Sequence, residues 1–199
     1  MLSRVQPMSP DPSRLIAAQL RPGEELLWAG RPDPAVTFAP SDAFMIPMGI
    51  AFCAFIVFWE ATVVGEGAPL LFALWGVPFM AMGLNLLVGR FFVKRWQKRR
   101  TVYGLTDRRA VVLVGDRSLR DGPVQDQPTD VRRSRDGKHV SVTFGAGPPR
   151  LPVGAGSAAS LGNTGMEWMS RGAVPLAFYD VEPVQPLLDA LATAARGPR

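Results

Sequence analysis

The residues that most often carry nucleophilic or metal chemistry are scarce, since the chain of 199 residues contains one histidine, His139, and one cysteine, Cys53. A histidine acting as a general base needs a neighbouring nucleophile or an orienting carboxylate, and a metal needs several ligands. His139 falls on the polar face of a predicted strand, and Cys53 lies inside an apolar run. We therefore expect a surface histidine, no metal or other cofactor, and no enzymatic activity.

A glycine-rich stretch, Val-Gly-Ala-Gly-Ser-Ala at residues 153–158, is similar to part of a dinucleotide-binding fingerprint. That fingerprint requires a buried strand before it and a helix after it, within a βαβ unit. Three prolines precede it instead: Pro148, Pro149 and Pro152. Residues 145–173 are therefore predicted to form a long loop rather than a phosphate site.

The apolar residues are concentrated in the second quarter of the chain, where residues 43–59 and 68–89 carry no charge. Extended to residue 64, the first run is long enough to cross a hydrocarbon core about 30 Å thick. A short Gly-Glu-Gly turn separates the runs, which predicts an antiparallel helical hairpin of residues 43–64 and 68–89. The rival interpretation is a pair of buried helices in a soluble protein, but neither run has a polar face and the chain is small.

Polar and small residues within these runs suggest how the hairpin packs. Glu60 lies near the outer end of its helix, so its side chain is expected to reach the membrane interface or to be protonated there. If the hairpin is symmetric about Glu66, Asn85 faces Pro47. Because Pro47 has no N–H, the Ala43 carbonyl lacks its usual helical donor, and the Asn85 amide can donate a hydrogen bond to it instead. The alternative role for Glu60 and Asn85 is in the path of an oligomeric transporter or channel subunit. Three glycines indicate close helix packing: Gly49, Gly76 and Gly83.

A basic segment follows the hairpin, whereas the turn between the two runs has no basic residue. The positive-inside rule therefore predicts that both termini are cytoplasmic and that Glu66 is outside. The net charge of +5 could indicate a nucleic-acid partner, but its location beside the predicted spans argues against one. The segment can bind anionic lipid headgroups or act only in setting the topology. The candidate headgroup contacts are Arg90, Lys94, Arg95, Lys98, Arg99 and Arg100.

Strand patterns lie on both sides of the hairpin. After an N-terminal tail of residues 1–20, in which residues 15–20 have helical character, residues 24–30 have strand character. This strand is too short to be stable alone, and the hairpin returns the chain close to where it left. We therefore expect residues 21–35 to pair with the later sheet, with Leu27 or Trp28 buried against it.

After the hairpin, residues 101–115 predict two strands around a turn at Thr106-Asp107-Arg108. Asp136-Gly137 is the strongest hairpin signal in the chain, between strands at 131–135 and 138–144. Alternation in the second of these strands predicts that three side chains are buried: Val140, Val142 and Phe144.

The end of the chain has the pattern of a strand followed by a helix. A strand is predicted over residues 173–179. It leads into an amphipathic helix over residues 181–195, with Asp180 as its N-cap.

Two motifs flank the hairpin: PGEELLWAGRP at residues 22–32 and YGLTDRRAVVL at residues 103–113. Over residues 20–190 this arrangement resembles the small bacterial membrane proteins with a pleckstrin-homology-like (PH-like) domain. In that family PGE-x-x-x-W-x-G-x-P and Y-x-L-T-x-x-R stretches flank two spans in the same order. The resemblance implies a cytoplasmic, helix-capped domain of seven strands, no enzymatic activity and no generally established ligand. The chain departs from the pattern over residues 145–178, which are longer and looser.

We therefore expect an α+β membrane protein: a transmembrane helical hairpin plus a small cytoplasmic PH-like β-barrel or sandwich. The β-domain is expected over residues 90–195, capped by the C-terminal helix. Its predicted role is non-catalytic interaction or scaffolding at the cytoplasmic face of a bacterial inner membrane. The expected partners are membrane lipid and a protein, with no nucleic acid.

Overall fold

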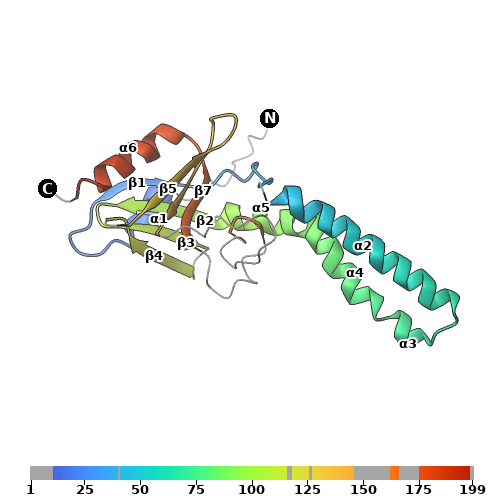
Figure 1. The fold of residues 1–199 in the computed structure, drawn as a ribbon. Helices are drawn as coiled ribbons and strands as arrows, with labels where there is room; N and C mark the ends of the chain where they lie inside the picture. Colours follow the sequence, from blue (N-terminus) through green and yellow to red (C-terminus); the bar gives the residue numbers. More distant parts are fainter. Residues whose placement is uncertain are drawn as a thin grey trace, which may run out of the picture. The chain divides into compact units, whose positions relative to one another are not determined.

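A computed structural model describes residues 11–39, 41–115, 118–125, 127–145, 162–165 and 175–197 (Figure 1). The glycine-rich residues 153–158 lie outside these ranges. The fold is α+β, with two antiparallel sheets and two long apolar helices. The chain divides into two compact units. We call residues 1–36, 97–147 and 175–199 the β-unit, and residues 37–96 and 148–174 the hairpin unit.

The first sheet of the β-unit has four antiparallel strands. They lie side by side in chain order: β1 (Leu26–Gly30), β2 (Thr101–Thr106), β3 (Arg109–Val114) and β4 (Ser118–Pro123). The strand before the apolar helices pairs with the strand after them, with Ala29 opposite Gly104. The β2–β3 turn lies at the predicted position.

Both faces of this first sheet are covered, which explains why β2 and β3 are buried along almost their whole length. One face carries Tyr103, Leu105 and Val112 into the larger apolar core. The other face carries Val102, Val111 and Leu113 into a smaller cluster with Ile16. Ile16 belongs to α1 (Pro12–Ala17), so part of the expected N-terminal tail is a helix that packs on the sheet.

The second sheet has three antiparallel strands in the order β5 (Thr129–Arg133), β6 (Val140–Phe144) and β7 (Leu176–Val181). β5 and β6 form the predicted hairpin, whose turn uses Gly137 at φ +70°, a conformation that glycine adopts without strain. The expected alternation in β6 is confirmed, because its three apolar side chains are buried: Val140, Val142 and Phe144.

The last helix, α6 (Val184–Ala194), begins three residues later than expected, with Pro183 as its N-cap. Asp180 therefore does not cap it. Its carboxylate instead accepts a hydrogen bond from Lys98. Leu187, buried on α6, joins the larger core. Trp28 is only partly buried at the edge of that core, with its ring centroid 5.9 Å from that of Phe178.

Two helices are long and apolar enough to cross a membrane, Asp42–Gly65 (α2) and the continuous helix Gly76–Arg100. Both belong to the hairpin unit, except for residues 97–100 at the end of the second helix. The second helix is not the single helix expected over residues 68–89. A short α3 (Leu70–Ala73) comes first, and α4 (Gly76–Leu84) then runs through a π-helical stretch (Asn85–Gly89) into α5 (Arg90–Arg100). Pro78 has no N–H for the Leu74 carbonyl, which accepts from Val77 instead, so the helix is interrupted there.

Three glycines set the register of the two antiparallel helices. A Cβ at Gly49 would meet Leu87, one at Gly83 would meet Cys53, and one at Gly76 would meet Glu60. The midpoint of the two residue numbers in each of these pairs is 68, whereas the prediction assumed symmetry about Glu66. Asn85 is therefore displaced along the helix from Pro47, and its side chain lies against Gly89 of its own helix.

Candidate functional site

The two sequence motifs that flank the hairpin are joined by a buried ion pair in the β-unit. Arg109 donates two hydrogen bonds to the carboxylate of Glu24, at 2.7 and 2.9 Å, and a third to Asp121 at 2.7 Å. The Arg109 and Glu24 side chains are 6% and 2% exposed. The hydrogen bonds from Arg109 lower the pKa of Glu24, against the opposing effect of burial. This arrangement positions β1 on the sheet, which is a structural role.

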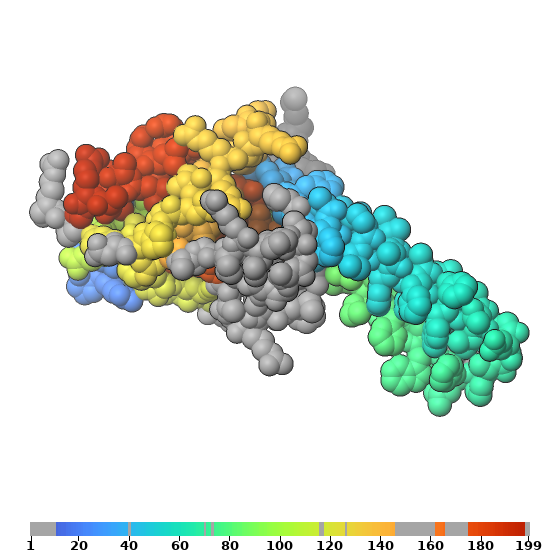
Figure 2. Space-filling view, viewed as in Figure 1, coloured from blue at the N-terminus to red at the C-terminus, as the bar shows by residue number. Residues whose placement is uncertain are grey.

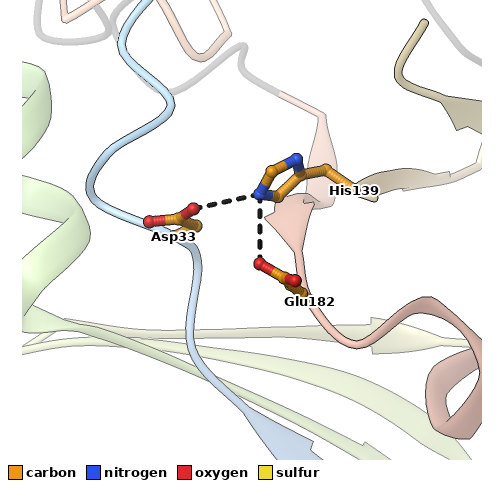
Figure 3. Close-up of side chains that lie close together, drawn as sticks. All are labelled: Asp33, His139 and Glu182. Carbon is orange, nitrogen blue, oxygen red and sulfur yellow. Dashed lines mark hydrogen bonds and ion pairs between the residues drawn. The ribbon is translucent and has the colours of Figure 1, made fainter. Parts of the chain in front are cut away.

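A different cluster, His139 with Asp33 and Glu182, lies where three segments of the β-unit meet (Figure 3). Val140 of β6 pairs with Val181 of β7, so the residues just beyond this pair, His139 and Glu182, come to the same end of the sheet. Pro32 forms a bridge with the same Val181, which brings Asp33 alongside.

The side chains of this cluster converge on one nitrogen of the imidazole. His139 Nε2 lies 3.0 Å from Asp33 Oδ2 and 3.5 Å from Glu182 Oε2. The His139 side chain is 12% exposed, against 53% for Glu182. The expectation of a solvent-facing histidine without companions is therefore wrong. It failed because His139 lies just outside the strand and because its partners are 106 and 43 residues away in the sequence.

The surrounding hydrogen bonds hold these groups in place. The N–H of Ala35 donates to Asp33 Oδ1 at 2.7 Å, and this bond is the main cause of the lowered pKa of Asp33. His139 makes a smaller contribution to that shift, and burial opposes it. The carbonyl of Asp33 accepts from Lys98 Nζ, which also pairs with Asp180 at 2.6 Å. On the far side of the ring, Asp136 Oδ2 is 4.0 Å from His139 Nδ1.

The six candidate headgroup residues on α5 divide into two sets. Arg90, Lys94 and Lys98 recur every four residues and are buried. Within the hairpin unit, Arg90 pairs with Asp42 and Lys94 donates to the Thr37 carbonyl at 2.8 Å. Within the β-unit, Lys98 binds the groups named above. These three side chains therefore face protein groups, and the exposed candidates that are left are Arg95, Arg99 and Arg100.

Glu60 lies in the seam between the two apolar helices. The carboxylate lies against Gly76 of the opposite helix, and its Oε2 atom is buried without a hydrogen-bond partner among the described residues. Gly76 is the first residue of α4, so the carboxyl group lies beside the N-terminal end of a helix. Cys53 lies in the same helix seam, beside Gly83.

A groove of about 620 Å³ lies between α6 and β5 in the β-unit, where Figure 2 shows α6 in red beside the β5–β6 hairpin in yellow. Among the described strands β5 is the outer one of its sheet, so one of its backbone edges has no described strand beside it in that sheet. Apolar side chains line the groove, among them Val124, Val131, Leu188 and Leu191.

The chain matches no protein-family model, no curated protein and no solved structure.

Proposed function

We propose that the chain is a non-catalytic membrane protein of the bacterial inner membrane. In this proposal the hairpin anchors the β-unit at the cytoplasmic face, where the β-unit docks a protein partner. The PH-like classification also belongs to this proposal. It is supported by seven strands among the described residues, a helix against the core and the two motifs joined by Glu24 and Arg109.

The observation that carries the anchoring proposal is the exposure of large apolar side chains along the hairpin. Phe58 is 70% exposed on α2 and Leu71 is 76% exposed on α3. Soluble proteins rarely expose contiguous apolar surface of this kind. In a bilayer the same side chains contact lipid tails, and the backbone polar groups are satisfied within each helix.

The groove between α6 and β5 is the surface that best fits docking of a protein segment. An extended segment can add to the edge of β5 through main-chain hydrogen bonds while its side chains contact Val131 and Leu188. The exposed arginines of α5 can contact anionic headgroups at the same time.

Thiol labelling in intact cells tests the anchoring and its orientation. In a Cys53→Ala background, a cysteine at position 66 is expected to react with a membrane-impermeant maleimide, and a cysteine at position 137 only after lysis. Gly137 is a matched choice because it occupies an exposed turn. Labelling of position 137 alone in intact cells contradicts the orientation, and recovery of the chain in the soluble fraction contradicts anchoring.

A photo-crosslinking amino acid tests the docking face separately. Placed at Val131, it is expected to give a discrete protein adduct in cells, and placed at Asp189, on the exposed side of α6, it is expected to give none. An adduct should disappear when Leu188 is replaced by Lys. Equal cross-linking from both positions contradicts docking in the groove.

The second candidate function, an oligomeric transporter or channel subunit, has one observation in its favour. A buried Glu60 oxygen has no hydrogen-bond partner within the part of the chain that the structure describes. Ionisable groups inside membrane helices often mark ion pathways. Native mass spectrometry in detergent separates the two proposals. Anchoring requires no particular oligomeric state, whereas a pore requires an oligomer that persists in detergent. Such an oligomer is expected to conduct ions in planar bilayers, and the Glu60→Gln variant is expected not to.

A further inference from the structure

We propose that Asp33, His139 and Glu182 form a binding site for a first-row divalent transition metal such as Zn²⁺. This site is independent of the proposed function, because it rests on side chains of the β-unit alone. One ligand atom from each residue lies within 4.8 Å of the other two (Figure 3).

The cluster has one more acceptor than the imidazole nitrogen can serve, and a cation can complete such an arrangement. Nε2 carries at most one hydrogen, so it can donate to only one carboxylate at a time. Two carboxylate oxygens nevertheless flank this nitrogen, Asp33 Oδ2 at 3.0 Å and Glu182 Oε2 at 3.5 Å. A metal bound between the three groups satisfies all of them and balances the two negative charges.

The two separations from His139 Nε2 suit metal–ligand bonds. With bonds of about 2.1 Å to nitrogen and oxygen, separations of 3.0 and 3.5 Å correspond to angles at the metal of about 90° and 110°. These angles lie within the range of tetrahedral to octahedral coordination. A metal bonded to both carboxylate oxygens also needs these two atoms within about 4.2 Å of each other, and the structure places them within 4.8 Å. One imidazole with two carboxylates suits Zn²⁺ or Mn²⁺ better than Ca²⁺, which prefers oxygen ligands throughout.

A neighbouring hydrogen bond holds one of the ligands in place. The Asp33 carboxylate is fixed through its other oxygen by the Ala35 N–H, which leaves Oδ2 turned toward the histidine. The nearby ammonium of Lys98 is paired with Asp180, so its charge is offset locally.

The site is open enough to be loaded and to hold water as a further ligand. Glu182 is 53% exposed and Asp33 26% exposed, whereas the histidine is nearly covered. Three protein ligands with a solvent-facing position form the arrangement of an open metal site rather than of a closed structural one.

Because His139 is the only histidine, one imidazole reports directly on the site. The experiment uses the full-length chain, purified without a histidine tag in detergent micelles and stripped with a chelator. With ¹⁵N-labelled histidine, stoichiometric Zn²⁺ is expected to shift the single pair of imidazole nitrogen resonances, and titration is expected to give one Zn²⁺ per chain. Equimolar Ca²⁺ is expected to leave the resonances unchanged.

Variants separate ligation from folding. Asp33→Asn and Glu182→Gln are each expected to weaken Zn²⁺ binding about 10-fold or more, given that even supporting groups of metal sites contribute 10–100-fold. Asp130→Asn, which removes an exposed carboxylate on β5, is the matched control and should bind like the unmodified chain. Imidazole resonances that do not move with stoichiometric Zn²⁺ overturn the proposal, as do Asp33→Asn and Glu182→Gln variants that bind like the control.

Discussion

The β-unit and the hairpin unit bury opposite kinds of residue. In the β-unit, Leu105 and Phe178 are fully buried, and the exposed strands β4 and β5 are mostly polar. In the hairpin unit, large apolar side chains face outward while Asp42 and Arg90 lie inside at 4% and 1% exposure. The β-unit therefore has the pattern of a domain folded against water, and the hairpin has the pattern expected of helices surrounded by lipid.

The contrast extends to how each unit is packed. The β-unit fills its core with aromatic and branched side chains, such as the Tyr103 and Phe178 rings stacked at 4.8 Å. The hairpin seam is built instead on glycines that allow the two helices to approach closely. Small residues are what close helix packing needs where apolar burial gives no net driving force.

The largest expected effect comes from making the same substitution, Phe to Ala, once in each unit and comparing the loss of stability. Phe178→Ala, in the core of the β-unit, is expected to lower the free energy of unfolding by about 3–5 kcal/mol, as large core truncations do. Phe58→Ala, at a side chain that faces outward, is expected to cost little in detergent. Denaturant unfolding of the β-unit followed by tryptophan fluorescence measures the first effect, and thermal denaturation measures the second. Equal losses contradict the contrast.

The next effect depends on pH and is confined to the β-unit. Glu24→Gln keeps the shape but loses charged hydrogen bonds to Arg109, so it is expected to lower stability by about 2 kcal/mol at pH 7. The pKa of Glu24 is lowered below its ordinary value of 4.5, so this carboxylate stabilises the fold above that pH. Its contribution is lost as pH falls through the lowered pKa. The difference between the variant and the unmodified chain should therefore shrink in acid, and a difference that is constant down to pH 2 contradicts this account.

A smaller effect tests the glycine seam of the hairpin. A Cβ at Gly83 would lie 2.5 Å from Cys53 Sγ, so Gly83→Ala is expected to cost about 1–3 kcal/mol through overpacking. Adding Cys53→Ala should recover much of that loss, since it removes the colliding sulfur. Gly65→Ala is the matched control because nothing lies within 4 Å of its Cβ position. Thermal denaturation in detergent checks all three, and equal effects at positions 65 and 83 contradict the helix register.

The smallest effect concerns the exposed arginines of α5. Arg95→Gln and Arg99→Gln are each expected to reduce retention of anionic phospholipid by about 1 kcal/mol, or roughly five-fold. Native mass spectrometry of the chain released from nanodiscs measures the retained lipid. Arg132→Gln, at an exposed arginine of β5, is the control and should change nothing. Unchanged retention in the α5 variants indicates that this segment contributes only to topology.

The sequence allowed the prediction of features that depend on local pattern and length. Hydrophobic run length located the two apolar helices, and Asp-Gly located the β5–β6 turn. The predicted register of the two apolar helices was wrong by about one helical turn, as the position of Asn85 shows. The register depends on which side chains pack between the helices, and not on the centre of the connecting loop. The break before Gly76 could have been inferred from Pro78, which the sequence places eleven residues after the turn.

The candidate metal cluster could not be predicted, because its residues come together only through sheet pairing. His139 and Glu182 meet across the β6–β7 register, which the sequence alone does not specify. Asp33 joins them through the bridge at Pro32. The burial of one face of α5 could not be predicted from the sequence for a similar reason. Lys98 and Arg90 have the pattern of a solvated basic segment until the polar groups that they bind are known.

Spin-label accessibility tests the central contrast most directly. In a Cys53→Ala background reconstituted in liposomes, nitroxides are attached at Phe58 and Leu71 in the hairpin unit and at Val131 in the β-unit. Val131 is a fair comparison because it is an exposed apolar residue, at 43%. We predict that the two hairpin positions are relaxed strongly by oxygen and weakly by a water-soluble nickel chelate, and that position 131 shows the reverse. Nickel accessibility at positions 58 and 71 as high as at 131 would contradict the account, since it would place the apolar face of the hairpin in water.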